Sequence, residues 1–439
     1  MSITNRSVTP ASVGSPRTRE LLERRARTLG RHSPLFYDEP IELVAGSGAW
    51  VEDSAGRRYL DGYNNVPHVG HAHPVVADAV VTQMHRLALH TRYLNEHVLD
   101  YAEQLLATFE EPLDRVAFTN SGSEANELAL RIAWQHTGSR GVLVSDCSYH
   151  GTTYSLARVT TGLVTGESFA DHARALRIPD ATGMSAEQSA ELLVTSLREV
   201  DEAITSLQEA GHGVAVLLVD PLFSSEGLNT LPPGYVTGLV QRVRAAGGLV
   251  VSDEVQSGFG RTAESMWGYQ NHGIVPDMVT MGKPMGNGHP LGGTVLSDAL
   301  LEEFGSRNMY FNTFAGNPVS AAAGRAVLQV MRDEKLVERA VDLSEVVGAG
   351  FRELQRVDPR VSAVRGRGLY QGLEFTDPGT GAPDADTART VVEAMRNDGV
   401  LISRIGRNGN VLKIRPPLAI TEDDVQVLLE KLTTAVTAR

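Results

Sequence analysis

The chain has 439 residues, of which 42% are hydrophobic, so it is long enough to bury a large core, and we expect one large and one smaller domain. A formal net charge of −13 argues against nucleic acid as a partner, because phosphate backbones are bound by basic faces. The sequence has neither a membrane-spanning apolar run nor an apolar signal segment, so we expect a cytoplasmic protein with no membrane partner. Its single cysteine, Cys147, cannot form an internal disulfide, which suits a reducing compartment.

The N-terminal part of the chain divides into an arm and a strand-rich segment. Residues 1–40 are rich in Arg, Ser and Pro and carry a helical patch from Arg19 to Leu29, which is typical of an arm that packs on a partner subunit. Residues 41–72 begin with the alternation expected of strands joined by turns at 46–48 and 54–56, and we assign them to the small domain.

Residues 73–325 alternate apolar, strand-like runs with segments of helical period. This pattern predicts a large α/β domain with a mainly parallel sheet flanked by helices, including helices near 124–136 and 185–210. The strand-like runs are RVAFTN, GVLVSD, VAVLLVDP, GLVVSDEV, DMVTMGK and GGTVLS.

The C-terminal part changes character after a small-residue helix near 321–330. Residues 326–439 follow the order helix, strand, helix, hairpin and helix, and we expect them to form a smaller α+β domain together with the N-terminal strands. Asn408 and Gly409 are expected to form a two-residue hairpin turn.

The first chemical motif is TNSGSEANELALRIA, in which a strand leads through a hydroxyl-rich turn into a helix that starts near Ser123. Unpaired backbone N–H groups and the helix dipole favour an anion there, and the hydroxyls of Ser121 and Ser123 add donors. A phosphate would fit this turn, although Ser123 as a simple helix cap would also explain it.

Two further motifs follow apolar strands and point to a cofactor. Asp253 ends the strand in GLVVSDEV, and ligands of open α/β sheets gather at such carboxyl ends. Its carboxylate suits a protonated pyridinium nitrogen. Lys283 follows the strand in DMVTMGKPMGNG and has apolar or glycine neighbours, which favours Schiff-base chemistry over a surface role.

These three motifs, in this order, resemble the class III family of aminotransferases that use pyridoxal 5'-phosphate (PLP) and have fold type I. The resemblance implies that Lys283 binds PLP and transfers protons, Tyr149 stacks on the ring, Val255 packs on its other face, Gln256 approaches the ring hydroxyl, and Thr313 reaches the phosphate from the neighbouring subunit of a homodimer. It gives Lys283, Asp253 and Tyr149 as catalytic residues. The implied cofactor-binding residues are Ser121, Gly122, Ser123, Tyr149, His150, Asp253, Val255, Gln256, Lys283 and Thr313.

The choice of reaction depends on the groups around the substrate, because PLP supports several reactions. The segments NNVPHVGHAHP, HTRYLNEHVLDYAEQL and RNGNVLKIRPP look most like the branch that contains ethanolamine-phosphate phospho-lyase. This likeness implies elimination of phosphate from a small phosphorylated amine such as phosphoethanolamine. The expected substrate-binding residues are Arg92 and Arg415, as cations for the phosphate, and Tyr63.

An aminotransferase that passes the amino group to pyruvate or another keto acid is the alternative, since Arg415 would then bind a carboxylate. Related aminotransferases commonly carry a glutamate at the position of Ser225, and whether Glu226 replaces it stays open. Two positions depart from the family pattern. Asp220 stands where the relatives usually have glutamate, and Arg415 stands where the animal phospho-lyases tend to have lysine. A PLP-binding protein without catalysis would have no evident use for Lys283.

The histidines His68, His71 and His73 lack a cysteine or carboxylate that completes a recognisable ligand set, so we expect pocket or turn roles and no metal.

Overall fold

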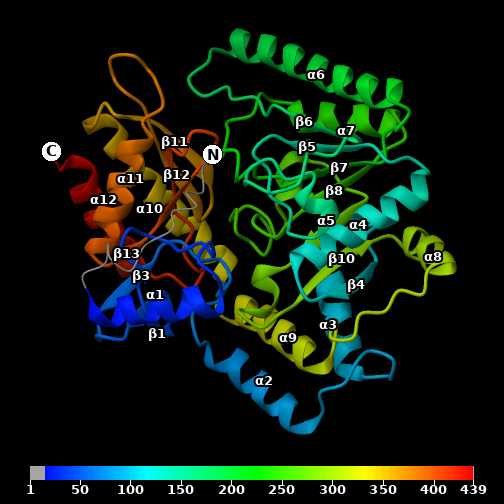
Figure 1. The fold of residues 1–439 in the computed structure, drawn as a ribbon, viewed down its shortest axis with the longest axis horizontal. Helices are drawn as coiled ribbons and strands as arrows, with labels where there is room; N and C mark the ends of the chain where they lie inside the picture. The colour runs from blue at the N-terminus through cyan, green and yellow to red at the C-terminus, as the bar shows by residue number, and fades with distance from the viewer. Residues whose placement is uncertain (1–14, 439) are drawn as a thin grey trace.

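A computed structural model describes residues 15–438 of the chain, and the first 14 residues of the predicted arm lie outside that range. The elements gather in two groups (Figure 1). One contains the N-terminal strands, drawn in blue, together with the orange and red C-terminal elements. The other contains the cyan and green strands and the helices around them.

The larger group is built on a seven-stranded sheet that is mainly parallel. Only β10 runs antiparallel to its neighbours, β4 and β9. This arrangement confirms the predicted α/β fold. The strands, in spatial order, are β4 (Arg115–Thr119), β10 (Gly292–Leu296), β9 (Met278–Met281), β8 (Leu249–Asp253), β7 (Val216–Val219), β5 (Val142–Ser145) and β6 (Ala173–Leu176).

Helices cover both faces of this sheet, which explains why its strands are apolar throughout rather than alternating. One face packs against α4 (Gly122–Thr137) and α8 (Asp298–Arg307), and the other against α6 (Ala186–Glu209) and α7 (Tyr235–Ala245). The remaining helices of this part are α2 (Pro74–Arg86), α3 (Glu96–Leu106), α5 (Tyr154–Ala157), α9 (Pro318–Asp333) and the 3-10 helices η2 (Gly268–His272) and η3 (Lys283–Gly286).

The smaller group joins the two ends of the chain. Strand β13 (Val400–Leu401) pairs in parallel with β3 (Arg58–Asp61), so a C-terminal strand extends the N-terminal sheet. That sheet also contains β1 (Leu43–Ser47) and β2 (Trp50–Asp53). The second sheet has the order β11 (Val361–Arg367), β12 (Tyr370–Phe375), β15 (Val411–Lys413) and β14 (Ser403–Ile405), and the helices are α1 (Pro16–Thr28), α10 (Leu336–Val357), α11 (Ala385–Asn397) and α12 (Glu422–Thr437). The exact domain boundaries stay a prediction.

The hairpin near Asn408 differs from its predicted form. Ile405 pairs with Val411, so the turn between β14 and β15 contains the five residues 406–410 rather than two. Gly406 and Gly409 both have positive φ, at 86° and 65°, and the Asn410 amide donates to the carbonyl of Phe375 at 2.8 Å. The extra residues therefore tie the loop to β12.

Within residues 15–438, no helix combines the length and the apolar character that crossing a membrane requires.

Candidate active site

The predicted cofactor groups meet in one pocket at the carboxyl ends of the central strands. The pocket has a volume of about 290 Å³. Segments that follow β4, β5, β7, β8 and β9 reach it, as expected for an open α/β sheet. Nine of the ten predicted cofactor residues line it, namely Ser121, Gly122, Ser123, Tyr149, His150, Asp253, Val255, Gln256 and Lys283.

The start of α4 forms one wall of the pocket. Ser121, rather than Ser123, is the N-cap: its backbone is extended, with φ −156°, and its hydroxyl accepts the N–H of Glu124 at 3.2 Å. The N–H groups of Gly122 and Ser123 find no acceptor among the described residues. A Cβ on Gly122 would lie 2.7 Å from a methyl carbon of Val255, so only glycine fits there. The helix end therefore offers free donors to an anion.

Asp253 lies at the end of β8 and is held by three donors or potential donors. Its Oδ2 accepts the amide of Asn126 at 2.8 Å and lies 2.8 Å from Nδ1 of His150, and its Oδ1 accepts the N–H of Val255 at 3.1 Å. The side chain is only 4% exposed. These contacts fix the direction of a carboxylate suited to a pyridinium nitrogen.

Asn126 connects these groups, and the sequence analysis did not identify it. It lies on α4 and is 1% exposed. Its amide also donates to the carbonyl of His150 at 2.8 Å, and its Oδ1 accepts the hydroxyl of Thr280 at 2.6 Å. The signal in the sequence was a polar residue next to Ala125 on the buried part of a helix. Since a buried amide needs partners, it positions the groups that it bonds.

Lys283 opens η3 directly after β9. Burial and, to a smaller extent, the positive charge of Arg415 lower the pKa of its amine to about 8, while Asp253 and Asp220 act in the opposite direction. The amine is therefore neutral more often near pH 7 than a surface lysine, which favours nucleophilic attack on an aldehyde. Tyr149 lines the same pocket, and burial followed by the charge of Asp253 raises the pKa of its phenol.

Arg415 lies beside this pocket and is 3% exposed. Its guanidinium donates to Oε1 of Gln256, and its Nε donates to the carbonyl of Tyr63 at 3.2 Å. The guanidinium carbon is 5.5 Å from the centre of the Tyr63 ring. Two of the three predicted substrate-binding residues therefore lie together, next to a predicted cofactor residue.

Glu226 does not form an ion pair with Arg415. Its carboxyl accepts the hydroxyl of Ser145, and burial raises its pKa to about 8, helped by the charge of Asp220. A carboxyl of this kind is mostly protonated at neutral pH. It therefore does not take over the glutamate role that Ser225 lacks, and Arg415 has no carboxylate partner among the described residues.

The remaining two predicted residues, Arg92 and Thr313, are exposed and do not line the Lys283 pocket of the same chain. The guanidinium of Arg92 stacks on Phe311, 3.9 Å from the ring centre. Thr313, two residues further along, is exposed. The structure thus brings Arg92 and Thr313 to neighbouring loops but not to the pocket.

The three histidines of the 68–73 segment have separate partners. His68 contacts the carbonyl of Phe259 at 2.7 Å, His71 contacts Asp61 at 2.7 Å, and His73 contacts Glu334 at 3.0 Å. In the part of the chain that the structure describes, no group of three or more metal-ligating side chains converges.

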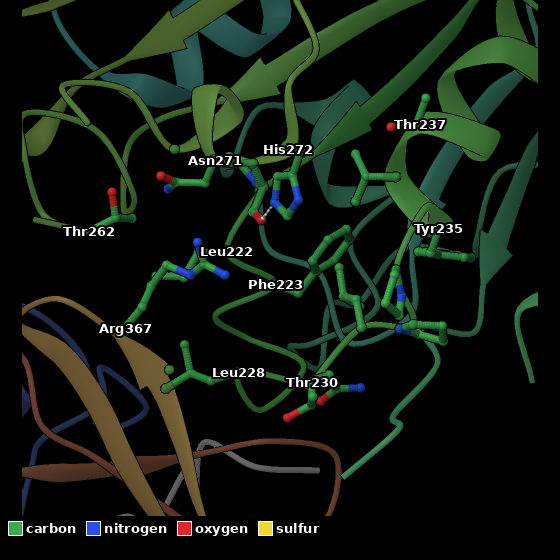
Figure 2. Close-up of a pocket in the computed structure, with 18 of the residues that line it drawn as sticks. Leu222, Phe223, Leu228, Thr230, Tyr235, Thr237, Thr262, Asn271, His272 and Arg367 are labelled. Carbon is green, nitrogen blue, oxygen red and sulfur yellow. Dashed lines mark hydrogen bonds between the residues drawn. The ribbon is translucent and has the colours of Figure 1, made fainter. Parts of the chain in front are cut away.

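A second pocket, of about 440 Å³, is lined in part by residues that follow directly in sequence on a residue of the first (Figure 2). Asp220 lines the Lys283 pocket, and the next three residues line the second one. Figure 2 shows His272 near its centre, with Nε2 2.7 Å from the carbonyl of Pro221. Burial lowers the pKa of this histidine, so it is largely neutral. The start of α7 lines the second pocket, but no lysine or acid does, and the chemistry belongs to the first.

Comparison with known proteins agrees with this geometry. Residues 37–436 match the family described as aminotransferase class-III. The chain is 34% identical to ethanolamine-phosphate phospho-lyase homolog 1 of Caenorhabditis elegans, over 95% of this chain and 94% of that protein. It is 35% identical to an alanine–glyoxylate aminotransferase 2-like protein of Drosophila melanogaster, over 93% and 85% of the two chains. Its fold is similar to that of a phospholyase from Arthrobacter in complex with phosphoethanolamine, with 56% identity, a TM-score of 0.94 and coverage of 95% and 100%.

Proposed function

This chain belongs to the aminotransferase class III family of PLP-dependent enzymes, and within that family we propose that it is a phospho-lyase that eliminates phosphate from a small phosphorylated amine such as phosphoethanolamine. The observation that carries the proposal is the 56% identity, over 95% of the chain, with a phospholyase that holds phosphoethanolamine. The buried Arg415, which has no carboxylate partner among the described residues, supplies a cation for such a substrate.

The residues of the pocket fit PLP as the cofactor. The free N–H groups at the start of α4 would bind its phosphate, Asp253 would hold the ring nitrogen, and Tyr149 and Val255 would contact the ring. Lys283 would carry the cofactor covalently through its amine. When bound, PLP supplies an electron-withdrawing ring that stabilises negative charge at the substrate carbon next to the nitrogen.

Once the substrate amine has replaced the Lys283 amine on the cofactor, the freed Lys283 would act as the base and Arg415 as the anion-binding group. The amine of Lys283 takes a proton from the carbon that carries the substrate nitrogen, and the bond between the neighbouring carbon and the ester oxygen breaks. That oxygen keeps the electron pair and leaves as phosphate, stabilised by Arg415. Addition of one water balances the overall conversion of phosphoethanolamine to acetaldehyde, ammonia and phosphate. No keto acid takes part.

The same proposal includes a homodimer with shared active sites, in which Thr313 and Arg92 serve the partner subunit. The two residues lie on loops joined by the stack of Arg92 on Phe311, so they would reach the partner's site together. Both loops expose large apolar side chains, with Leu94 fully exposed and Met309 94% exposed. Such side chains are usually covered by another surface. A cytoplasmic location also belongs to the proposal.

A class III aminotransferase is the second candidate, because the same arginine would bind the carboxylate of an amino acid and the Drosophila relative carries that name. One experiment separates the two. The purified, PLP-loaded enzyme is incubated with phosphoethanolamine and no keto acid. Release of phosphate and acetaldehyde over many turnovers supports the lyase, whereas a requirement for pyruvate or another acceptor overturns it. Lys283→Ala should abolish turnover in either case.

A further inference from the structure

Lys413 is a second buried cation beside Arg415, and the sequence analysis gave it no role. It ends β15, and residues two apart on an extended chain point to the same side. The amine of Lys413 lies 5.3 Å from the ring centre of Tyr63 and 5.6 Å from that of Tyr370. The guanidinium carbon of Arg415 lies 5.5 and 5.1 Å from the same two centres. The two cations therefore share one pair of aromatic rings.

Neither cation is neutralised by a carboxylate in the described part of the chain. Lys413 is 8% exposed and Arg415 3% exposed, and no ion pair joins either of them to an acid among residues 15–438. Burial lowers the pKa of Lys413 well below its usual value, and the charges of Arg415 and Lys283 lower it further, with only Asp220 opposing. Buried positive charge without a carboxylate partner is costly, and an anion bound here would favour the protonated form of Lys413 over the neutral form.

There is open space for that ligand. Lys413 and Tyr63 both line a cavity of about 250 Å³, whose other lining residues include Arg389 and the acids Asp38 and Glu393. Gln256, which Arg415 bonds, lines the Lys283 pocket. Arg415 thus contacts a residue of the Lys283 pocket, while Tyr63 and Lys413 beside it line this cavity.

The choice of lysine is also informative. Only four of the 40 basic Lys and Arg residues are lysines, and one of these is Lys283, where the chemistry needs an amine. Lys413 is a second. An ammonium group is a compact charge with three donors, whereas the planar guanidinium of Arg415 suits one edge of an anion. A tetrahedral phosphate offers oxygens to both cations at once, while a planar carboxylate has one edge, which Arg415 alone satisfies.

We propose that Lys413 and Arg415 together form the subsite for the substrate phosphate, and that Lys413 is the residue that selects phosphate over carboxylate. The inference rests on the proposed phospho-lyase activity and names the group that sets its substrate class. During elimination, the ammonium of Lys413 lies where negative charge develops on the leaving phosphate.

The test compares Lys413→Met with the matched control Lys335→Met, which removes an exposed lysine at the start of α10. The probes are 2-aminoethylphosphonate, whose carbon–phosphorus bond is not eliminated, and 3-aminopropanoate, its carboxylate counterpart. Their dissociation constants are measured on PLP-loaded protein from changes in the cofactor absorbance. The KM and kcat for phosphoethanolamine are measured in parallel.

Loss of Lys413 should weaken the phosphonate by about tenfold to a hundredfold, the factor associated with one charge-assisted hydrogen bond. Binding of 3-aminopropanoate should change less than about threefold, and Lys413→Arg should restore part of the phosphonate affinity because it keeps the charge. Equal losses for both probes, or no loss for the phosphonate, would overturn the inference. If Lys413→Met does not accumulate as PLP-loaded protein, Lys413→Gln is measured in the same way.

Phosphonate binding needs no elimination, so this test is independent of the proposed reaction. An enzyme that requires a keto acid but still loses phosphonate affinity with Lys413→Met would retain the subsite and lose the phospho-lyase assignment. An enzyme that releases phosphate but binds the phosphonate equally well in Lys413→Met would have the activity without this subsite.

Discussion

Lys283 in the PLP-free protein should lose its proton near pH 8, and this should set the pH dependence of cofactor capture. Burial, aided by the charge of Arg415, lowers the pKa of the amine from 10.5 to about 8. The neutral share is then about one tenth at pH 7, one half at pH 8 and nine tenths at pH 9. An amine at the usual value would be about 300-fold less often neutral at pH 7. Capture should therefore rise about tenfold from pH 7 to 9 and then level off.

Removing the neighbouring cation should move this profile. Arg415→Met eliminates a positive charge that disfavours the protonated amine, so the pKa of Lys283 rises and fewer amines are neutral at pH 7. Capture at pH 7 should become about threefold to tenfold slower, whereas the rates of the two proteins should converge near pH 10, where both amines are neutral.

The measurement is the rate at which the visible absorbance of bound PLP appears after the cofactor is mixed with the PLP-free protein. Arg198→Met, at an exposed position on α6, is the matched control, and the ionisation of free PLP is common to all three proteins. A wild-type rate that keeps rising tenfold per pH unit up to pH 10 would refute the reasoning. So would an Arg415→Met midpoint equal to that of the wild type.

Three further outcomes can be measured on the same protein. Gly122→Ala should weaken PLP binding, because its new methyl group meets Val255 at 2.7 Å, and adding Val255→Ala should restore affinity in equilibrium dialysis; no recovery would contradict the steric cause. Asn126→Leu should lower the free energy of unfolding by about 2 kcal/mol or more in denaturant melts, since buried Asp253 and Thr280 lose a hydrogen bond. It should also reduce turnover in rate assays, because Asp253 is no longer held in position. Between pH 8 and 10.5, the free energy of unfolding of the PLP-free protein should rise relative to that of Lys283→Met, because in this range the folded protein has lost the Lys283 proton and the unfolded chain keeps it. Denaturant melts at several pH values that give the two proteins the same pH dependence would exclude this.

The predictable part of the fold is the part in which each element carries its own signal. The six apolar runs all became strands of the central sheet, because strands buried on both faces must be apolar along their whole length. Strand β6 was not predicted, since Arg174 interrupts its short apolar run at the sheet edge. The hairpin turn was located correctly at Asn408, but its length depended on a contact with β12 that no local pattern records.

The predictable part of the site follows the same rule. Lys283 and Asp253 each end an apolar strand, which marks them within a few residues of sequence. Asn126 bonds Asp253 across 127 positions of the chain, and Lys413 near one end of the chain meets Tyr63 near the other, so neither role is visible locally. Whether Thr313 reaches a partner's site stays a prediction.

The division of labour between the two parts of the molecule explains how one cofactor site supports different reactions. Asp253 is the last residue of β8 and Lys283 follows β9, and the buried sheet constrains the positions of both. The cations that we propose for substrate binding come instead from the smaller group: Lys413 ends β15, in a separate sheet, and Arg415 follows two residues later. A change at Lys413 should therefore alter which anion is bound with less effect on the proposed PLP-binding groups than a change at Arg415, which bonds Gln256 and lowers the pKa of Lys283. Substrate class should accordingly vary more readily along β15 than along the strands of the central sheet.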